Sequence, residues 1–577
     1  MTAVWAPRAQ QVEVVVDEVR APLTREDGGW WRGPQLPHGT DYGLCVDGGP
    51  PRPDPRSPWQ PHGVHGPSRT FDTSRHRWQD GDWRGRDVRG TVLYELHVGT
   101  FTREGTLDAA IGRLDHLVDL GVDTVELMPV AAFPGVHGWG YDGVALYAVH
   151  DPYGGPAALQ RFVDAAHGRG LAVCLDVVHN HLGPSGNYLA EFGPYFTDRH
   201  HTPWGQAVNL DGDDAHEVRA FVIDNATRWL REFHLDALRL DAVHALVDDS
   251  PTHLLAEMST AVDALSDEVG RPLTLIAESD LNDPRTVTPV QDGGLGMGAQ
   301  WADDVHHALH AMVTGERHGY YVDFGSTATT AKALTEVFVH DGTWSTFRGR
   351  TWGRPVPEHL DGHRFVVFGS NHDQVGNRAL GDRPSQYLQD GQLAATAALV
   401  LLSPFTPMLF MGEEWGARTP WAYVTDHAEP ELVEAIRKGR QEEFAGHGWA
   451  ELYGHDVQVP DPQDPATVTS SVLDWQERDD AGGARLLTWY RDLIRLRRAV
   501  ADLADGDRAR VRVEHEEGRW LVLHRGGHAV VVNLTDGPLT VPVESAQVLL
   551  EWGTQPGATG LEVAAHGVAV VRREEQR

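Results

Sequence analysis

From Thr91 onward, short apolar runs alternate with segments in which apolar residues recur every three or four positions. This alternation predicts strands followed by helices. Eight strands are expected, at 91–98, 122–128 and 171–178 and near Leu235, Leu273, Gly298, Phe365 and Pro407. Helices are expected over 107–120, 156–168, 217–233 and 486–500. Repeated strand-helix units form parallel sheets with right-handed crossovers, so the pattern predicts an α/β fold built on a (β/α)8 TIM barrel.

The two ends of the chain follow a different pattern, in which apolar and polar residues alternate in short runs. Strand candidates at 11–16 and 42–46, with a Pro-rich tract at 49–58, predict an N-terminal β-sandwich over 1–89. We expect it to brace the barrel rather than to bind glycan. Runs at 520–524 and 528–532 predict a small C-terminal β domain over 506–577. The barrel would then occupy 90–505, with a long excursion at about 180–216 and no clear periodicity between 412 and 486.

Three of the predicted strands end in a carboxylate. Asp241, Glu278 and Asp373 each follow an apolar run. The C-terminal ends of barrel strands converge on one mouth, where active sites are built. Arg239 lies two residues before Asp241 and would share its face of the strand. Taken alone, this pair is more simply a buried salt bridge, but three converging acids are typical of glycoside hydrolysis, in which two carboxyl groups act across one bond.

The third strand ends in Asp176, His179, Asn180 and His181. These residues lack the helical spacing of a zinc site and no cysteine cluster accompanies them, so hydrogen bonding to sugar hydroxyls is the better interpretation. Asn209, Asp211, Asp213 and Asp214 leave a calcium site open, although turn and helix-cap roles are favoured. We therefore predict no metal and no cofactor.

The segments 176–181, 238–244, 277–280 and 370–373 resemble, in order, the four signature regions of the α-amylase superfamily, glycoside hydrolase family 13. The resemblance implies that Asp241 is the nucleophile, Glu278 the general acid/base and Asp373 the carboxylate that binds ring hydroxyls. It implies a sugar-stacking role for Tyr141. The remaining substrate-binding residues implied are Asp142, Asp176, Asn180, His181, Arg239, His244, Asp280, His372 and Gln374.

Within the superfamily, the sequence of these and neighbouring segments is most similar to the trehalohydrolases that act on maltooligosyltrehalose. The segments 94–101, 233–236, 277–283, 301–310 and 371–378 carry this similarity. It implies a retaining hydrolase of trehalose biosynthesis that cuts the α-1,4 bond next to a terminal trehalose unit. Where many amylases have Lys-His after the nucleophile region, this chain has His244-Ala245, so contacts to the leaving group must differ. Branching enzyme and isoamylase remain the enzymatic alternatives, and a glycan-binding barrel without activity the non-enzymatic one.

Two mechanistic expectations follow from the resemblance. Retention requires the carboxyl groups of Asp241 and Glu278 to lie about 5 to 5.5 Å apart. Glu278 must be protonated before cleavage, and we expect the nearby charges of Asp241 and Asp373 to raise its pKa.

Composition narrows the partners and the compartment. The net charge of −34 argues against nucleic acid as a partner, but is no obstacle to a neutral sugar. The two cysteines, Cys45 and Cys174, fall in different predicted domains, so no disulfide framework is expected. Neither a secretory leader nor a run of about 18 apolar residues is seen, which favours a cytoplasmic protein without membrane contact. Oligomeric state stays open between monomer and dimer.

Overall fold

A computed structural model describes residues 2–446, 449–453, 457–543, 546–556 and 560–573. Its centre is a closed barrel of eight parallel strands, taken in chain order around the barrel, with the strand of lowest number pairing with the last. The strands are β8 (Leu93–Leu96), β9 (Thr124–Leu127), β12 (Ala172–Val177), β15 (Ala237–Leu240), β16 (Thr274–Ala277), β17 (Ala299–Trp301), β20 (Phe365–Phe368) and β21 (Thr406–Phe410). All eight predicted strands are confirmed.

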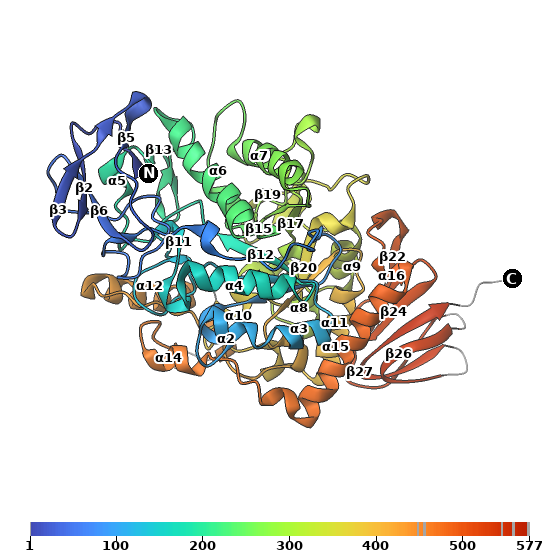
Figure 1. The fold of residues 1–577 in the computed structure, drawn as a ribbon. Helices are drawn as coiled ribbons and strands as arrows, with labels where there is room; N and C mark the ends of the chain where they lie inside the picture. Colours follow the sequence, from blue (N-terminus) through green and yellow to red (C-terminus); the bar gives the residue numbers. More distant parts are fainter. Residues whose placement is uncertain (1, 447–448, 454–456, 544–545, 557–559, 574–577) are drawn as a thin grey trace.

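Helices surround the barrel (Figure 1). They are α1 (Val98–Phe101), α2 (Leu107–Ile111), α3 (Leu114–Leu120), α4 (Gly155–His167), α6 (Ala215–Glu232), α7 (Leu254–Val269), α8 (Asp303–Thr314), α9 (Thr327–Glu336), α10 (His372–Gly376), α11 (Asp390–Leu401) and α15 (Ala481–Ala499). The prediction of one helix over 107–120 was wrong, because α2 ends at Ile111 and a new helix begins at Leu114. Both halves still bury the apolar residues that gave the periodicity, among them Leu107, Leu114 and Leu117.

Two small antiparallel sheets precede the barrel. One contains β1 (Ala3–Trp5), β5 (Trp30–Arg32) and β4 (Thr24–Arg25), and the other β3 (Val19–Pro22), β2 (Val12–Val16), β6 (Asp41–Val46) and β7 (Ser68–Arg69). These sheets contact the excursion: Trp5 packs edge-on against Tyr195 at 5.3 Å and Arg52 pairs with Glu191 at 2.8 Å. Such contacts are what a bracing role requires.

The C-terminal region is one six-stranded sheet at the opposite end of the molecule from the N-terminal sheets (Figure 1). It follows α16 (Ala501–Ala504) and contains β22 (Val511–Glu516), β23 (Trp520–Arg525), β24 (His528–Asn533), β25 (Leu539–Val541), β26 (Ala546–Pro556) and β27 (Leu561–Arg573). The sheet packs against α9, α11 and α15, where Trp489 meets Trp552 at 5.8 Å. The predicted C-terminal β region is therefore present, while the exact domain boundaries stay predictions.

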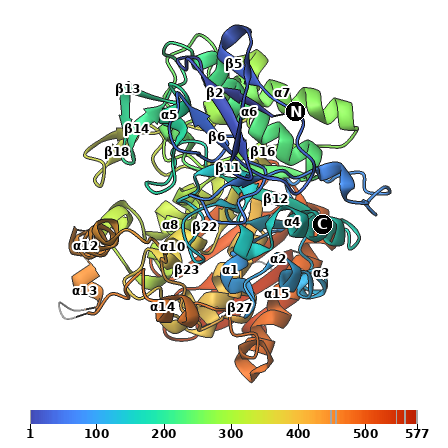
Figure 2. The same ribbon diagram turned by 60° about the vertical axis from the view of Figure 1, so that its left-hand side comes forward.

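Several insertions lie at the C-terminal ends of the barrel strands. They are β10 (Ala131–Ala132), β11 (Ala145–Val149), α5 (Leu189–Phe192), β13 (Phe196–Thr202), β14 (Gly205–Val208), β18 (Thr343–Ser345), β19 (Arg350–Trp352), α12 (Pro430–Gly446), α13 (Trp449–Tyr453) and α14 (Pro465–Ser470). Figure 2 shows β13, β14, β18 and α12 on the same side of the molecule. The last three helices fall in the region where no periodicity was found.

Two expectations about thiols and membranes can be compared with the fold. Cys45 and Cys174 are both free and buried, as expected for thiols in separate regions. Among the helices of the described ranges, none combines the length and the apolar character needed to cross a bilayer.

Candidate active site

The register of the barrel brings the predicted acids together. Strands β12 and β15 pair Asp176 with Arg239, and β15 and β16 pair Leu240 with Ala277. The next residues along these strands, Asp241 and Glu278, therefore lie side by side at the C-terminal edge. Two backbone hydrogen bonds continue the ladder there, from the Asp241 N–H to Val177 and from the Glu278 N–H to Leu240.

Arg239 is the fully buried centre of the site. Its Nη1 donates to both carboxylate oxygens of Asp176, at 2.9 and 2.8 Å, and to Oδ1 of Asp241 at 2.7 Å. Its Nη2 lies 3.6 Å from Glu278 Oε2. The guanidinium stands 4.3 Å from the ring centre of Trp301, the last residue of β17. A single cation thus holds three carboxyl groups in place, and the expected Arg239–Asp241 pair is present.

Asn180 fixes the second oxygen of Asp241. Its Nδ2 donates to Asp241 Oδ2 at 2.8 Å and to the Asp241 carbonyl at 2.8 Å. Next to it, His181 Nδ1 donates to Asn180 Oδ1 at 2.6 Å. The His181 ring is stacked at 4.5 Å on Trp204, a half-exposed residue in the turn between β13 and β14. The Asp241 carboxylate is therefore oriented from two sides.

Glu278 has the properties of a proton donor. Burial, followed by the charges of Asp241, Asp303 and Asp373, raises its pKa to about 8 although Arg239 opposes the shift. The expected like charges of Asp241 and Asp373 therefore do raise this pKa, and burial, which the sequence did not indicate, contributes more. Oε2 accepts a hydrogen bond from the backbone N–H of Ala242 at 2.5 Å. Ala242 adopts a left-handed conformation with φ of 40°, a strained geometry that turns this N–H toward Glu278.

Tyr141 and His372 form one wall of the site. Their rings are stacked with centroids 5.2 Å apart, and the Tyr141 hydroxyl donates to Asp176 Oδ2 at 2.6 Å. Burial raises the pKa of Asp176 to about 6, while Arg239 works against the shift. On the far side of the imidazole, His372 Nδ1 lies 2.6 Å from Glu95 of β8.

A cavity of about 710 Å³ opens over these groups. Its walls include the predicted residues Tyr141, Asp142, His181, Asp241, His244, Glu278, His372 and Asp373. Asp176, Asn180 and Arg239 are buried beneath it. The cavity is large enough for part of a sugar chain, and three of its carboxylates, those of Asp241, Glu278 and Asp373, come from the ends of β15, β16 and β20.

Besides the three residues beneath the cavity, two further predicted residues do not line it. The Asp280 carboxylate forms an ion pair with Arg348 instead. The Gln374 carboxamide caps α10, where its Oε1 accepts the N–H of Asn371 at 3.0 Å. The resemblance placed both beside the sugar; in this structure the Asp280 carboxylate oxygens contact Arg348, and Gln374 Oε1 accepts a backbone hydrogen bond.

Sequence reasoning missed other residues of the site. Trp139, Trp204, Tyr423 and three residues of α12, Ile436, Gly439 and Arg440, also line the cavity. The aromatic content of the 180–216 excursion could have indicated Trp204, but nothing in the periodicity indicated α12. Glu95, which contacts His372, was also missed, although its position as an acidic residue inside the apolar run 93–96 could have indicated it.

The possible calcium site can be examined in the same region. Asn209 spans a turn, accepting from the Gly212 N–H at 3.0 Å and donating to the Asp213 carbonyl at 2.9 Å. Asp214 stands at the N-cap position of α6, but its side chain makes no capping hydrogen bond.

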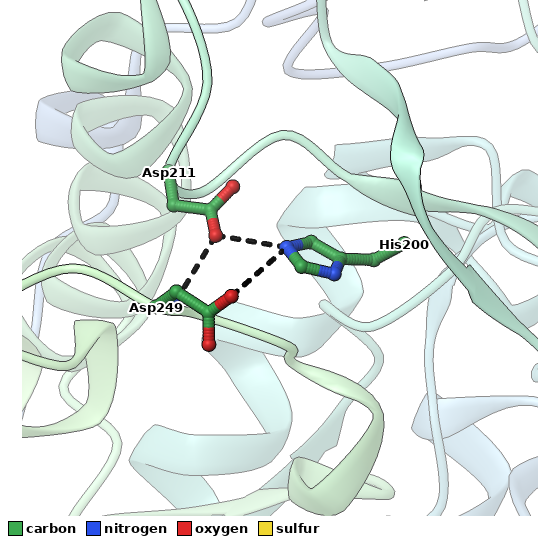
Figure 3. A group of neighbouring side chains, drawn as sticks. All are labelled: His200, Asp211 and Asp249. Atoms are coloured by element: carbon green, nitrogen blue, oxygen red, sulfur yellow. Dashed lines mark hydrogen bonds and ion pairs between the residues drawn. The ribbon is translucent and has the colours of Figure 1, made fainter.

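Asp211 belongs to a different group, with His200 and Asp249 (Figure 3). His200 Nε2 lies 2.8 Å from Asp211 Oδ2, which also accepts the Asp249 N–H, and Arg199 pairs with the same carboxylate at 3.2 Å. These donors already satisfy Asp211, and we assign no metal to the group.

Comparisons with known proteins agree with this geometry. A family model described as the alpha-amylase catalytic domain matches residues 68–204, and a domain of unknown function, DUF3459, matches residues 506–570. A solved structure described as a putative alpha amylase from Salmonella typhimurium has a TM-score of 0.90 and 35% identity, covering 99% of this chain and 97% of that one.

Curated relatives give the narrower family. The malto-oligosyltrehalose trehalohydrolase of Arthrobacter ramosus is 56% identical over 99% of both chains. A 1,4-alpha-glucan branching enzyme of Vibrio parahaemolyticus is more distant, at 30% identity over 72% of this chain and 58% of its own. The chain therefore belongs to the malto-oligosyltrehalose trehalohydrolase family.

Proposed function

We propose that this protein hydrolyses the α-1,4-glucosidic bond next to the terminal trehalose unit of maltooligosyltrehalose and releases free trehalose, a step of trehalose biosynthesis. The observation that carries the proposal is the meeting of Asp241, Glu278 and Asp373 on one cavity, above a single buried arginine. Family membership supports the choice of bond. The proposed reaction proceeds with retention of configuration.

In the first step, Asp241 attacks the anomeric carbon while Glu278 protonates the bridging oxygen. Trehalose leaves, and the sugar is held as an ester of Asp241. Arg239 and Asn180 hold both oxygens of the attacking carboxylate, so little reorganisation is needed. Because burial raises the pKa of Glu278 to about 8, this group carries its proton at neutral pH.

In the second step, Glu278 removes a proton from water, which attacks the ester and restores Asp241. Asp373 lies on the same cavity and would bind ring hydroxyls of the sugar. The face of the Tyr141 ring that is not stacked on His372 would stack on the sugar ring. The Asp241–Glu278 carboxyl separation of about 5 to 5.5 Å stays a prediction of this mechanism.

Product analysis separates the alternatives. We expect maltopentaosyltrehalose to give trehalose and maltopentaose, and maltoheptaose to be cleaved much more slowly. New α-1,6 branches in the products would indicate a branching enzyme, and cleavage of α-1,6 bonds an isoamylase. Absence of any bond cleavage by a folded protein would leave only the glycan-binding alternative. The Asp241→Asn variant is the control for a contaminating hydrolase.

A further inference from the structure

Glu95 is a buried acidic residue within the apolar strand β8, and only 1% of its surface is exposed. Both of its carboxylate oxygens contact one residue. Oε1 lies 2.6 Å from His372 Nδ1, and Oε2 accepts the backbone N–H of His372 at 3.0 Å. Glu95 does not line the cavity, so it acts on the site only through its neighbours.

Charged groups on several elements surround the His372 ring. Glu95 on β8 and Asp373 on α10, whose Oδ1 is 3.5 Å from Nε2, favour the protonated imidazole. Burial and the Arg239 guanidinium on β15 oppose it. His97, which follows β8, has its pKa lowered to about 4 by burial and is neutral at pH 7. Despite its burial, the Glu95 carboxylate raises the pKa of His372 to about 9.

The hydrogen bonds around Tyr141 lead to the same protonation state by a separate route. The Tyr141 hydroxyl has one hydrogen and donates it to Asp176 Oδ2 at 2.6 Å. The Tyr141 hydroxyl oxygen also lies 2.9 Å from His372 Nε2. Because its only hydrogen goes to Asp176, His372 Nε2 must be the donor in that contact. Nδ1 donates to Glu95, so both ring nitrogens carry a proton. A neutral ring with its hydrogen on Nδ1 would instead compete with Asp176 for the tyrosine hydrogen.

The hydrogen bond between Glu95 and His372 is the first in a continuous chain of hydrogen bonds that ends at the attacking carboxylate of Asp241. It runs from Glu95 through His372 and Tyr141 to Asp176, then through Arg239 Nη1 to Asp241 Oδ1. Every link before Asp241 is a buried or half-buried side chain, so water does not replace a missing donor without cost.

We propose that Glu95 is a positioning residue that keeps His372 protonated on both nitrogens, and so sets the direction of the hydrogen bonds that orient Tyr141 and Asp176 beneath the sugar. This inference rests on the function proposed above. It assigns Glu95 no contact with substrate, and no proton of Glu95 is consumed in the reaction.

The pH dependence of kcat/KM with maltopentaosyltrehalose tests the proposal. In wild type, Glu278 sets the alkaline limit near pH 8, below the pKa of His372. In Glu95→Gln, His372 loses its compensating charge and becomes the first group to titrate. The alkaline limit should move down by at least about one pH unit, which is about a fivefold loss at pH 8 and about a tenfold loss at pH 9 and above. We expect the loss in kcat to exceed the change in KM.

Two further variants separate positioning from a general effect of mutating the barrel interior. Glu126→Gln changes a buried carboxyl on the neighbouring strand β9, which is 1% exposed and does not contact His372. It should keep the wild-type alkaline limit. Glu95→Asp keeps the negative charge and should restore the limit toward the wild-type value.

A second readout is independent of activity. In ¹⁵N-histidine-labelled full-length protein, with the His372 signals identified by His372→Gln, both ring nitrogens should be protonated at pH 7.5 in wild type and only one in Glu95→Gln. A neutral His372 in wild type, or an alkaline limit unchanged in Glu95→Gln, would overturn the inference. If Glu95→Gln does not fold, the wild-type spectrum and Glu95→Asp decide. Failure of wild type to release trehalose overturns the proposed function instead, and leaves the spectrum interpretable.

Discussion

Strand β15 has a buried aspartate at each end, and the two differ in what their oxygens contact. Asp236, just before the strand, accepts from Trp83 Nε1 at 2.8 Å, His167 Nε2 at 3.0 Å, Arg271 Nη1 at 3.0 Å and the backbone of Val173 at 3.0 Å. It is fully buried. Asp241, just after the strand, is held by Arg239 and Asn180 but faces a cavity. The first carboxylate is saturated by the protein, and the second keeps a face for substrate.

The comparison teaches how to distinguish structural from functional buried acids. Composition is similar at both ends, with an arginine and a histidine close to each aspartate. At the N-terminal end, His167 also contacts Asp80 at 3.0 Å, so the N-terminal segment completes the network. At the C-terminal end, one side of the hydrogen-bond network faces the cavity. The end of β15 at Asp236 is called the closed end below, and the end at Asp241 the open end. The structural aspartate and the functional aspartate are therefore distinguished by whether protein donors occupy all their hydrogen-bonding positions, rather than by burial or charge.

The largest expected effect is on activity at the open end. Asp241→Asn removes the proposed nucleophile, and kcat/KM with maltopentaosyltrehalose should fall at least about 10⁴-fold. Because Arg239 keeps Asp176 as a partner, urea unfolding should show little loss of stability. Activity within tenfold of wild type in a preparation free of contaminating hydrolase would refute the nucleophile assignment.

The same substitution at the closed end should have the opposite profile. Asp236→Asn removes the carboxylate charge that Arg271 and His167 share and leaves Asp80 as the remaining acid at His167, so it should lower the free energy of unfolding by about 3 to 5 kcal/mol. The activity of the fraction that folds should stay close to wild type. Asp241→Asn is the matched control, since it makes the same chemical change five residues later. Equal destabilisation by both variants would remove the distinction between the two ends.

A third prediction concerns the barrel interior between these ends. Burial, and then the charges of Glu95 and Asp176, raise the pKa of Glu126 to about 8 from an ordinary value of 4.5. Folding therefore takes up a proton at this site, so its contribution to stability is complete below about pH 4.5 and is lost as pH rises toward 8. The stability of wild type relative to Glu126→Gln should decline by about 1.4 kcal/mol per pH unit across that window. Parallel stability curves from pH 5 to pH 8 would contradict it.

The smallest effect tests the contact between the N-terminal segment and the closed end. Trp83→Phe keeps an aromatic ring over His167, on which Trp83 is stacked at 4.7 Å, but removes one donor to Asp236. Stability should fall by about 1 to 2 kcal/mol, measured by urea unfolding, with kcat/KM unchanged. Substituting Trp204, an aromatic residue of the cavity, provides the contrast, since it should affect KM more than stability.

The sequence was most informative where local pattern determines structure. Apolar runs of the barrel strands, and carboxylates placed at their ends, were sufficient to predict the β15, β16 and β20 positions of Asp241, Glu278 and Asp373. Long-range contacts were not predictable in this way. Helix α12 lacks a periodicity that stands out from its polar surroundings, yet Ile436 and Gly439 reach the cavity through tertiary packing.

Electrostatics showed the same limit. Sequence spacing suggested that like charges raise the pKa of Glu278, but the extent of burial, which contributes more, depends on the whole fold. Asp303, which also acts on Glu278, comes from the start of α8 and was not distinguished from other acidic residues by its sequence position. Glu95 similarly acquires its importance only when the barrel closes β8 beside the segment that carries His372.

The most direct test of the proposed mechanism is the configuration of the sugar at the moment of release. When wild-type protein cleaves maltopentaosyltrehalose, ¹H NMR of the first turnovers should show free trehalose together with the α-anomer of maltopentaose, before mutarotation produces the β form. Initial appearance of the β-anomer, or cleavage without trehalose, would contradict the account.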